Sequence, residues 1–371
     1  MSVELLERTT ESKVDARVEG GVIDCDIHPA PKGPMGVMPY LPERWQEHLK
    51  TFGSNYRQPF AVGMPYPRFG DGNRMDAKLP DGGYGGSDLG FMQAQHLDAN
   101  NIAYGILQPL SPNAQSQRNL AYAAALSTAV NDWQRDAWCV PDPRLKASLV
   151  VPQEDAEASV REIEARAGDG NFVQVSLCPR GIEPLGRKRY WPIFDAAVEA
   201  GLPIGLHVGG FGGMPPSGSG WFSYYLEDHH GNAESMQALV TSLVLEGVFE
   251  AFPTLKIVLI EGGFVWLPAL SWRLDKHWKT LKGEVPHLRR APSEYIRDHF
   301  WFTTQPIDEP QKPQHMRETI DWIGWDKILF STDYPHWDYD DPKTSLNKIR
   351  MSEAERRMIF RGNAAKLYGL D

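Results

Sequence analysis

Residues 22 to 31 read VIDCDIHPAP, an apolar stretch in which Asp24, Asp26 and His28 stand at every second position. Side chains two residues apart on a strand point to the same face, so this alternation predicts a strand with its polar side chains on one face, the interior of the fold, and Asp24 deepest. Alone, Asp-x-His is a weak signal of a functional site, because buried polar side chains often form structural hydrogen bonds with each other and nothing more. The rest of the chain has to decide what these residues do.

Seven further runs of apolar and β-branched residues follow, and most of them, such as IGLHV and KIVLIE, are nearly continuous hydrophobic segments. Runs of this kind are typical of strands that are buried on both faces of a parallel sheet. The eight predicted strands comprise residues 22–28, 102–108, 146–151, 172–177, 203–208, 256–261, 300–304 and 327–332.

Helical patterns alternate with these strands, for example EDAEASVREIEARA, YWPIFDAAVEAG and SEAERRMIFRGNAAKLYG. This succession predicts an α/β protein with a (β/α)8 TIM barrel, and a doubly wound open sheet is the alternative. We expect one barrel domain at residues 22–371, preceded by an N-terminal extension at residues 1–21.

Two segments are too long for simple connections between a strand and its helix. They are loop insertions after the first and fifth predicted strands: residues 29–90, rich in proline and glycine, and residues 209–232, GGFGGMPPSGSGWFSYYLEDHHGN. The loops that follow barrel strands surround the active-site face. We therefore expect residues 29–90 to form a lid or a pocket wall and not a separate domain.

The composition of the 371-residue chain excludes some classes of partner. A formal net charge of -10 and a pI near 5.6 argue against nucleic acid and anionic membranes as partners. The first residues lack the apolar segment of a secretory signal, and no stretch is long enough to span a bilayer, so we expect a cytoplasmic protein. The cysteines Cys25, Cys139 and Cys178 form no metal or disulfide motif and are expected to be small buried side chains.

Four predicted strands end in polar residues that can bind a metal or transfer a proton. Besides Asp26 and His28 on the first strand, His207 ends the fifth in LPIGLHVGG, Glu261 ends the sixth in LKIVLIEGG, and Asp333 ends the eighth in ILFSTDYPH. In a barrel these ends meet at one rim. Asp26, His28, His207 and Asp333 make a mixed nitrogen and oxygen set that suits one divalent ion with an open coordination position.

The chain resembles the amidohydrolase superfamily, in the branch typified by aminocarboxymuconate semialdehyde decarboxylase. The resemblance runs from about residue 22 to the C-terminus through VIDCDIH, the block PLG to YWPIFDAAVEAGLPIGLHVGG, FPTLKIVLIEGG and FSTDYPH. It implies a barrel with a mononuclear metal and a small-molecule substrate.

The resemblance also implies metal-binding roles for His28, His207 and Asp333, which match the family pattern. Two positions depart from it: Asp26 stands where the first histidine of His-x-His is expected, and Glu261 stands where the sixth strand usually carries a histidine. Both substitutions place a carboxylate where the family has a histidine and so bear on the metal and on the reaction.

Counting charges gives one interpretation of these substitutions. With Asp26 and Asp333 ionised, a divalent ion is formally neutral and is a weaker Lewis acid, so a neighbouring base becomes more valuable. Glu261 is the candidate for a base that accepts a proton from water on the metal and passes it to the leaving group; the alternatives are a further metal ligand or a buried partner of an arginine. We expect zinc, with manganese or magnesium as competitors because carboxylates favour harder ions.

Five other residues are weaker candidates. The resemblance implies that Arg273 holds a substrate carboxylate across a subunit interface, which in turn implies a homodimer; the alternative is a helix-surface arginine. His229, His230 and Trp221 either contact substrate or belong to a solvated loop packed on the barrel. His336 in TDYPHWD is expected to interact with Asp333 and hold it in place without binding the metal itself.

These observations predict a metal-dependent hydrolase that acts on a carbon–nitrogen or activated carbon–carbon bond in a small cyclic or aromatic-derived substrate, with Glu261 and Asp333 as catalytic residues. The alternative is non-oxidative decarboxylation of an aromatic or enoic acid. Decarboxylation requires an anionic substrate, which a neutral metal centre attracts weakly unless Arg273 or another cation compensates. A third possibility is a non-catalytic barrel that only binds ligands. Such a protein would have apolar residues at the strand ends, and the polar strand ends of this chain argue against it.

Overall fold

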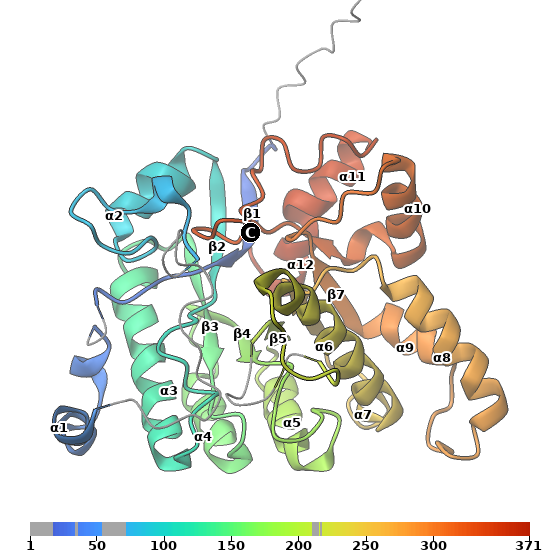
Figure 1. Cartoon of the computed structure of the whole chain (residues 1–371), viewed down its shortest axis with the longest axis horizontal. Helices are drawn as coiled ribbons and strands as arrows, with labels where there is room; N and C mark the ends of the chain where they lie inside the picture. The colour runs from blue at the N-terminus through green and yellow to red at the C-terminus, as the bar shows by residue number, and fades with distance from the viewer. Residues whose placement is uncertain (1–17, 34–35, 54–71, 210–214, 216) are drawn as a thin grey trace, which may run out of the picture.

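The computed structural model describes residues 18–33, 36–53, 72–209, 215 and 217–371. Eight parallel strands lie side by side in chain order in one sheet, and helices surround them (Figure 1). All eight predicted strands are confirmed. Their bounds are β1 (Val22–Ile27), β2 (Ile102–Leu107), β3 (Leu145–Val150), β4 (Phe172–Leu177), β5 (Ile204–His207), β6 (Ile257–Ile260), β7 (Phe300–Thr303) and β8 (Ile328–Leu329).

The sheet nearly closes into a barrel, because β1 and the segment that follows β8 are hydrogen-bonded. The Cys25 N–H donates to the Phe330 carbonyl at 2.9 Å, and the His28 N–H donates to the Tyr334 carbonyl at 2.7 Å. Strand order and closure confirm the (β/α)8 barrel and exclude the doubly wound sheet.

Helices follow the strands along the chain, and the three helical stretches named from the sequence are confirmed. Within the residues that the structure describes, none of the helices combines the length and apolar character needed to cross a membrane. The α-helices are α1 (Glu43–Phe52), α2 (Leu89–Met92), α3 (Leu120–Gln134), α4 (Ala156–Arg166), α5 (Trp191–Glu199), α6 (Tyr225–Leu245), α7 (Val248–Ala251), α8 (Leu267–Leu281), α9 (Pro292–His299), α10 (Pro313–Ile323), α11 (Glu353–Arg357) and α12 (Asn363–Tyr368).

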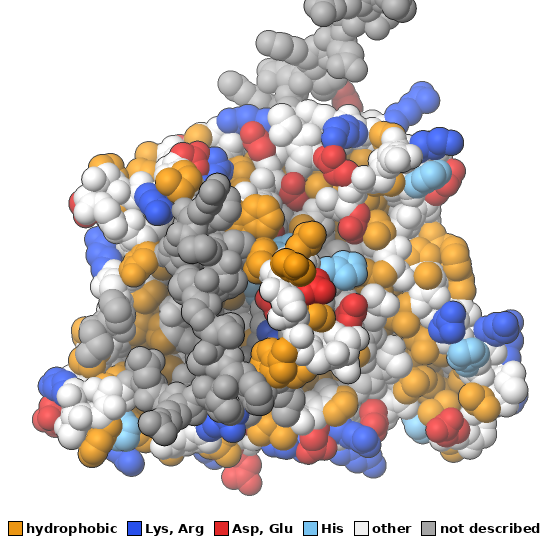
Figure 2. Space-filling view, in the orientation of Figure 1, with side chains coloured by type: hydrophobic (Ala, Val, Ile, Leu, Met, Phe, Trp, Pro, Cys, Tyr) orange, Lys and Arg blue, Asp and Glu red, His pale blue; other side chains and the backbone are white. Residues whose placement is uncertain are grey.

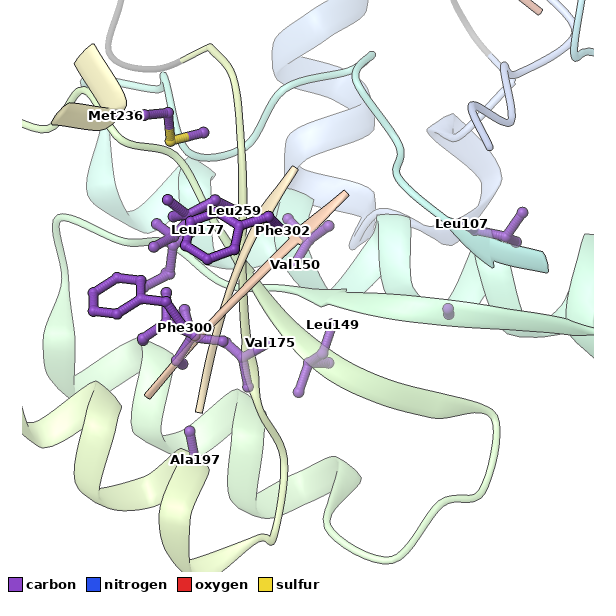
Figure 3. Packing of buried hydrophobic residues seen from close by; sticks show 14 of the residues in the cluster. Leu107, Leu149, Val150, Val175, Leu177, Ala197, Met236, Leu259, Phe300 and Phe302 are labelled. Carbon is purple, nitrogen blue, oxygen red and sulfur yellow. The ribbon is translucent and has the colours of Figure 1, made fainter. Parts of the chain in front are cut away.

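The main hydrophobic core lies between the strands and the surrounding helices. Alternate strand residues, such as Val175 and Leu177 of β4, point outward and pack with side chains from helices such as Ala197 of α5 and Met236 of α6 (Figure 3). Burial of this apolar layer is the main force that holds the helices on the barrel. The three cysteines are buried and unpaired, as expected.

A second, smaller cluster fills the inside of the barrel. Ile23 and Cys25 of β1 pack there with Val258 of β6 and with Tyr368 from the C-terminal helix α12. The Tyr368 hydroxyl donates to Gln174 Oε1 at 3.0 Å. The C-terminal helix therefore contributes to the barrel interior, below the polar strand ends.

The pairing of β1 with β2 is irregular, and this overturns one sequence expectation. The register shifts between Asp24 and Ile27, so strict alternation of faces fails there. Because of the shift, the neighbouring residues Cys25 and Asp26 both point into the barrel. His28 also points inward, and Asp26 and His28 reach the ends of the opposite strands. Asp24 instead points outward, so the expectation that it lies deepest on the inner face is wrong.

The long segment after β5 is partly helical, which corrects a second expectation. Helix α6 begins at Tyr225, so His229 and His230 lie on a helix and not on a loop. The Glu227 carboxylate accepts the N–H groups of Ser223 and Tyr224 at 2.9 and 3.0 Å and so caps the helix start. This capping allows the helix to begin inside the segment that was expected to be a loop.

The predicted N-terminal extension lies mostly outside the described residues, as do residues 54–71 of the predicted insertion. The described end of that insertion packs over the exit of β8, where the Trp337 N–H donates to the Gly72 carbonyl at 2.9 Å. The interpretation of residues 29–90 as a lid stays a prediction.

The barrel interior requires a glycine at position 205 of β5. A Cβ added to Gly205 would lie 2.6 Å from side-chain atoms of Gln174, which Ser148 and Tyr368 hold in place by hydrogen bonds. We expect Gly205→Ala to lower the free energy of unfolding by about 1–3 kcal/mol through overpacking. Urea denaturation checks this, and the added cost of Gly205→Ala should be smaller in a Gln174→Ala background; equal costs in both backgrounds would contradict the clash.

Candidate metal centre

Three parts of the chain bring the four predicted ligands together at the carboxyl end of the barrel. Asp26 lies in β1 and His28 directly follows it, His207 ends β5, and Asp333 lies in the segment after β8. His28 Nε2 lies 2.7 Å from Asp333 Oδ1 and 3.3 Å from Asp26 Oδ1, and His207 Nε2 lies 3.6 Å from the same Asp26 oxygen. All four side chains are almost completely buried.

The orientation of the two histidines shows that a positive charge belongs between these groups. His28 Nδ1 donates to the Gln108 carbonyl at 2.8 Å, and His207 Nδ1 donates to the Val208 carbonyl at 2.8 Å. The Nε2 lone pairs therefore face carboxylate oxygens, an arrangement that is repulsive unless a proton or a metal ion lies between.

Buried polar atoms without partners support the same conclusion. Among the described residues, both carboxylate oxygens of Asp26 and the Nε2 atoms of His28 and His207 have no hydrogen bond. Buried polar atoms are rarely left unsatisfied. Two imidazole nitrogens and carboxylate oxygens that converge in this way fit a divalent metal ion.

Glu261 borders the same site. One atom each from Asp26, His28, His207 and Glu261 lies within 4.8 Å of the others, and Glu261 Oε2 is 3.0 Å from His207 Nε2. Glu261 and Asp333 have positive φ angles of 59° and 63°, which non-glycine residues adopt at a cost of about 1–3 kcal/mol. Both strand ends thus turn sharply at the residue that carries the carboxylate. The geometry allows Glu261 to act as a base or as a ligand.

Burial and mutual repulsion shift the pKa values of the ligands. Burial raises the pKa of Asp26 to about 7, with His207 opposing the rise and Glu261 adding to it. Burial also raises the pKa of Asp333 well above its usual range, as do the charges of Glu261 and Asp338. Burial disfavours the charged form of His207, but Asp26 and Glu261 together raise its pKa well above the ordinary value. Without a metal, Asp333 and His207 therefore keep protons at neutral pH, and Asp26 is partly protonated there.

A second layer of polar groups lies behind Asp333. His336 Nδ1 is 2.5 Å from Asp333 Oδ1, and its ring stacks on that of His28 with the centroids 4.4 Å apart. Gln305 Nε2 donates to Asp333 Oδ2 at 3.3 Å and to Asp338 Oδ2 at 3.1 Å. His336 therefore lies where it can hold Asp333 in place.

A cavity of about 230 Å³ opens above the ligands. Acidic and histidine side chains lie close together near the centre of the face in Figure 2, bordered by hydrophobic ones. A cavity of this size suits a small molecule. Its described lining residues are Gly72, Leu110, Arg180, His207, Val208, Gly209, Tyr225, Asn232, Glu261, Asp333, His336, Trp337 and Asp338.

The predicted substrate-binding residues lie outside this lining. His229 is near it, because its Nε2 is 3.1 Å from Asp338 Oδ2, and this contact raises the pKa of His229. His230 is exposed, and the side chain of Trp221 is also largely exposed. Arg273 is exposed on α8, so a contact with substrate would require a second subunit. Their roles stay predictions.

Two charged lining residues were missed by the sequence reasoning. Arg180 follows β4 in SLCPRG, and Asp338 lies five residues after Asp333. Both stand just beyond a strand end, and a search for every charged residue in that position would have found them.

Fold and site together define a barrel enzyme with a metal site at the carboxyl ends of its strands. The chain belongs to the Amidohydrolase family, whose family model matches residues 23–370. The family resemblance seen in the sequence is thereby confirmed.

Several relatives have names that point to one reaction. A gamma-resorcylate decarboxylase from Polaromonas sp. (strain JS666 / ATCC BAA-500) is 27% identical over 303 residues, 76% of this chain and 88% of that protein. A 2-amino-3-carboxymuconate-6-semialdehyde decarboxylase from Dictyostelium discoideum is 22% identical over 227 residues, 60% of each chain. These names favour decarboxylation, the alternative reaction, over hydrolysis.

A solved structure with the same fold is the dihydroxybenzoic acid decarboxylase from Polaromonas sp. JS666 with bound manganese and the inhibitor 2-nitroresorcinol. It has a TM-score of 0.66 and 22% sequence identity, and the match covers 94% of this chain and 97% of that chain.

Metal binding should release protons. Because the pKa of Asp26 is raised to about 7 and that of His207 is raised as well, both hold protons below pH 7 that a metal must displace. We expect the apparent affinity for Mn²⁺ to fall as the pH decreases through about 7, by about tenfold per pH unit for each proton released. Titration calorimetry in buffers of different ionisation enthalpy measures both quantities. An affinity that stays constant from about pH 8 to about pH 6 would contradict this account.

Proposed function

We propose that the protein is a metal-dependent decarboxylase that releases CO₂ without oxidation from a small hydroxylated aromatic acid. The observation that carries this proposal is the position of Arg180 in the wall of the cavity that Glu261 and Asp333 also line. The names of the relatives support it as well.

Arg180 supplies the cation that an acid substrate needs. It is half-buried, its Nε donates to the Gly209 carbonyl at 2.9 Å, and burial lowers its pKa without bringing an arginine near neutrality. A guanidinium binds a carboxylate through paired hydrogen bonds. The weak attraction for anions that favoured hydrolysis is therefore offset by a residue of this chain.

We infer that Asp26, His28, His207 and Asp333 hold one divalent metal ion. Two carboxylate ligands favour a hard ion, and the Polaromonas structure holds manganese, so we propose manganese before zinc. When bound, the ion supplies Lewis-acid attraction for the oxygen atoms of the substrate. His336 and Gln305 keep Asp333 aimed at the site.

Glu261 is proposed to move the proton. Its carboxylate accepts the proton of the substrate hydroxyl and then donates it to the ring carbon that bears the carboxylate. The bond between ring and carboxylate breaks, CO₂ leaves, and the electron pair restores the aromatic ring as a phenolate, which takes one proton from water. Arg180 holds the substrate anion in place until the bond breaks.

One experiment distinguishes decarboxylation from hydrolysis. Manganese-loaded protein is incubated with a panel of hydroxybenzoates and, separately, with cyclic amides and lactones in ¹⁸O-labelled water. Release of CO₂ with no ¹⁸O in the aromatic product supports the proposal. Opening of an amide or lactone with ¹⁸O in the product, and no CO₂ from any acid, would establish hydrolysis instead.

Removing the cavity cation should weaken catalysis. We expect Arg180→Met to lower kcat/KM for a hydroxybenzoate by about 100-fold or more, mainly through KM, because the carboxylate loses its charged partner. The control is Arg161→Met on the exposed side of α4, which should stay within about twofold of wild type. Equal activity of the Arg180 variant and wild type would remove the main support for an anionic substrate.

Glu261→Gln tests the base role against the ligand role. If Glu261 moves the proton, the variant keeps its metal content and kcat falls by about 100- to 10,000-fold. Elemental analysis and steady-state kinetics measure the two effects. A variant that loses the metal as completely as Asp333→Ala would show that Glu261 is a ligand.

A further inference from the structure

The function proposed above leaves Asp24 without a role, although this carboxylate is fully buried on the outer face of β1. It accepts hydrogen bonds from four donors. Asp24 Oδ1 accepts the Asp26 N–H at 3.2 Å and the Thr332 N–H at 2.9 Å. Asp24 Oδ2 accepts the Thr332 hydroxyl at 2.6 Å and lies 2.8 Å from His96 Nε2.

His96 donates a hydrogen bond to Asp24 in this cluster. A carboxylate oxygen accepts, so His96 Nε2 carries the proton that faces Asp24. His96 Nδ1 lies 3.3 Å from Asn100 Nδ2, an amide nitrogen that can only donate, so Nδ1 is the acceptor; the Tyr339 hydroxyl lies 3.4 Å away. The buried Asp24 carboxylate is therefore held by hydrogen bonds to both of its oxygens.

Three of the four donors to Asp24 belong to the two segments that carry the proposed carboxylate ligands. The Asp26 N–H belongs to a ligand, and Thr332 directly precedes the ligand Asp333. A single oxygen atom, Asp24 Oδ1, binds both backbones and so fixes the distance between them. The Asp333 N–H also donates to the Asp26 carbonyl at 3.1 Å, which ties the same two segments.

The register shift in β1 is what makes this arrangement possible. Without it, Asp24 and Asp26 would point to the same face. With it, Asp24 points outward to His96 and to the backbone of Thr332 in the segment after β8, while Asp26 points into the proposed metal site.

We propose that Asp24 is a positioning residue that sets the separation of Asp26 and Asp333 so that both carboxylates bind one metal ion. His96 holds the Asp24 carboxylate in the required orientation, and the buried charge of Asp24 adds to the negative potential at the site. This inference rests on the metal site of the proposed function, but not on the reaction.

Asp24→Asn tests the proposal. The Asn amide keeps one acceptor oxygen for the two backbone N–H groups, but its NH₂ group faces two donors, the Thr332 hydroxyl and the imidazole of His96. We expect the Kd for Mn²⁺ to rise about 10- to 100-fold, read from the electron paramagnetic resonance signal of free Mn²⁺. The spectrum of the bound ion should also change shape, because the ligand geometry changes. Thr332→Val, a milder change, should give a smaller rise in the same direction.

Glu162 provides a matched control away from the site. Its carboxylate also accepts a threonine hydroxyl, that of Thr128 at 2.6 Å, together with donors from Asn131 and Arg166. Glu162→Gln should reduce the thermal unfolding temperature as Asp24→Asn does, while the Kd for Mn²⁺ stays within about twofold of wild type.

The outcomes separate this inference from the proposed function. Weaker Mn²⁺ binding in the Asp24 and Thr332 variants, and unchanged binding in the Glu162 control, supports the positioning role. Unchanged binding in the folded Asp24 and Thr332 variants, or equal weakening in the control, overturns it and leaves the metal site intact. A wild-type protein that binds no Mn²⁺ overturns the metal site and this inference together.

Discussion

The convergence of carboxylates and imidazole lone pairs inside the barrel is the constraint on which the rest of the site depends. Asp26 and Asp333 approach His28 and His207 to within 2.7–3.6 Å in a buried space. Negative charges and lone pairs that face each other in a buried space repel unless a positive charge lies between them. The raised pKa values of Asp26 and Asp333 are a consequence of this repulsion and of burial. A divalent ion would supply this positive charge and displace the protons that the acids otherwise hold.

The barrel provides the rigidity for this arrangement. The carboxyl ends of β1, β5 and β8 lie around one mouth because the strands are parallel and in chain order. Two of the carboxylates, those of Glu261 and Asp333, follow their strands in a left-handed backbone conformation. Such strain is maintained only where packing and hydrogen bonds on both sides hold the residue, and it is common at functional sites.

The fold and the meeting of Asp26, His28, His207 and Asp333 at one rim could be predicted from the sequence, because hydrophobic runs and strand-end residues are local signals. It could not place Asp24, since the register shift in β1 depends on pairing with β2, more than seventy residues away. It also missed Arg180, which reaches the cavity only because the loop after β4 folds toward β5. The start of α6 was misjudged because side-chain capping by Glu227 was not considered.

Charge balance connects these observations to the reaction. Two carboxylate ligands neutralise a divalent ion, and Glu261 adds a negative charge beside it, so the ligand set alone would repel an anionic substrate. The positive charge of Arg180 on the cavity wall attracts such a substrate. His229 hydrogen-bonds with the carboxylate of Asp338, which lines the same cavity. A carboxylate substrate can then be bound at the arginine without losing the base, which is the combination that decarboxylation of a hydroxylated acid requires.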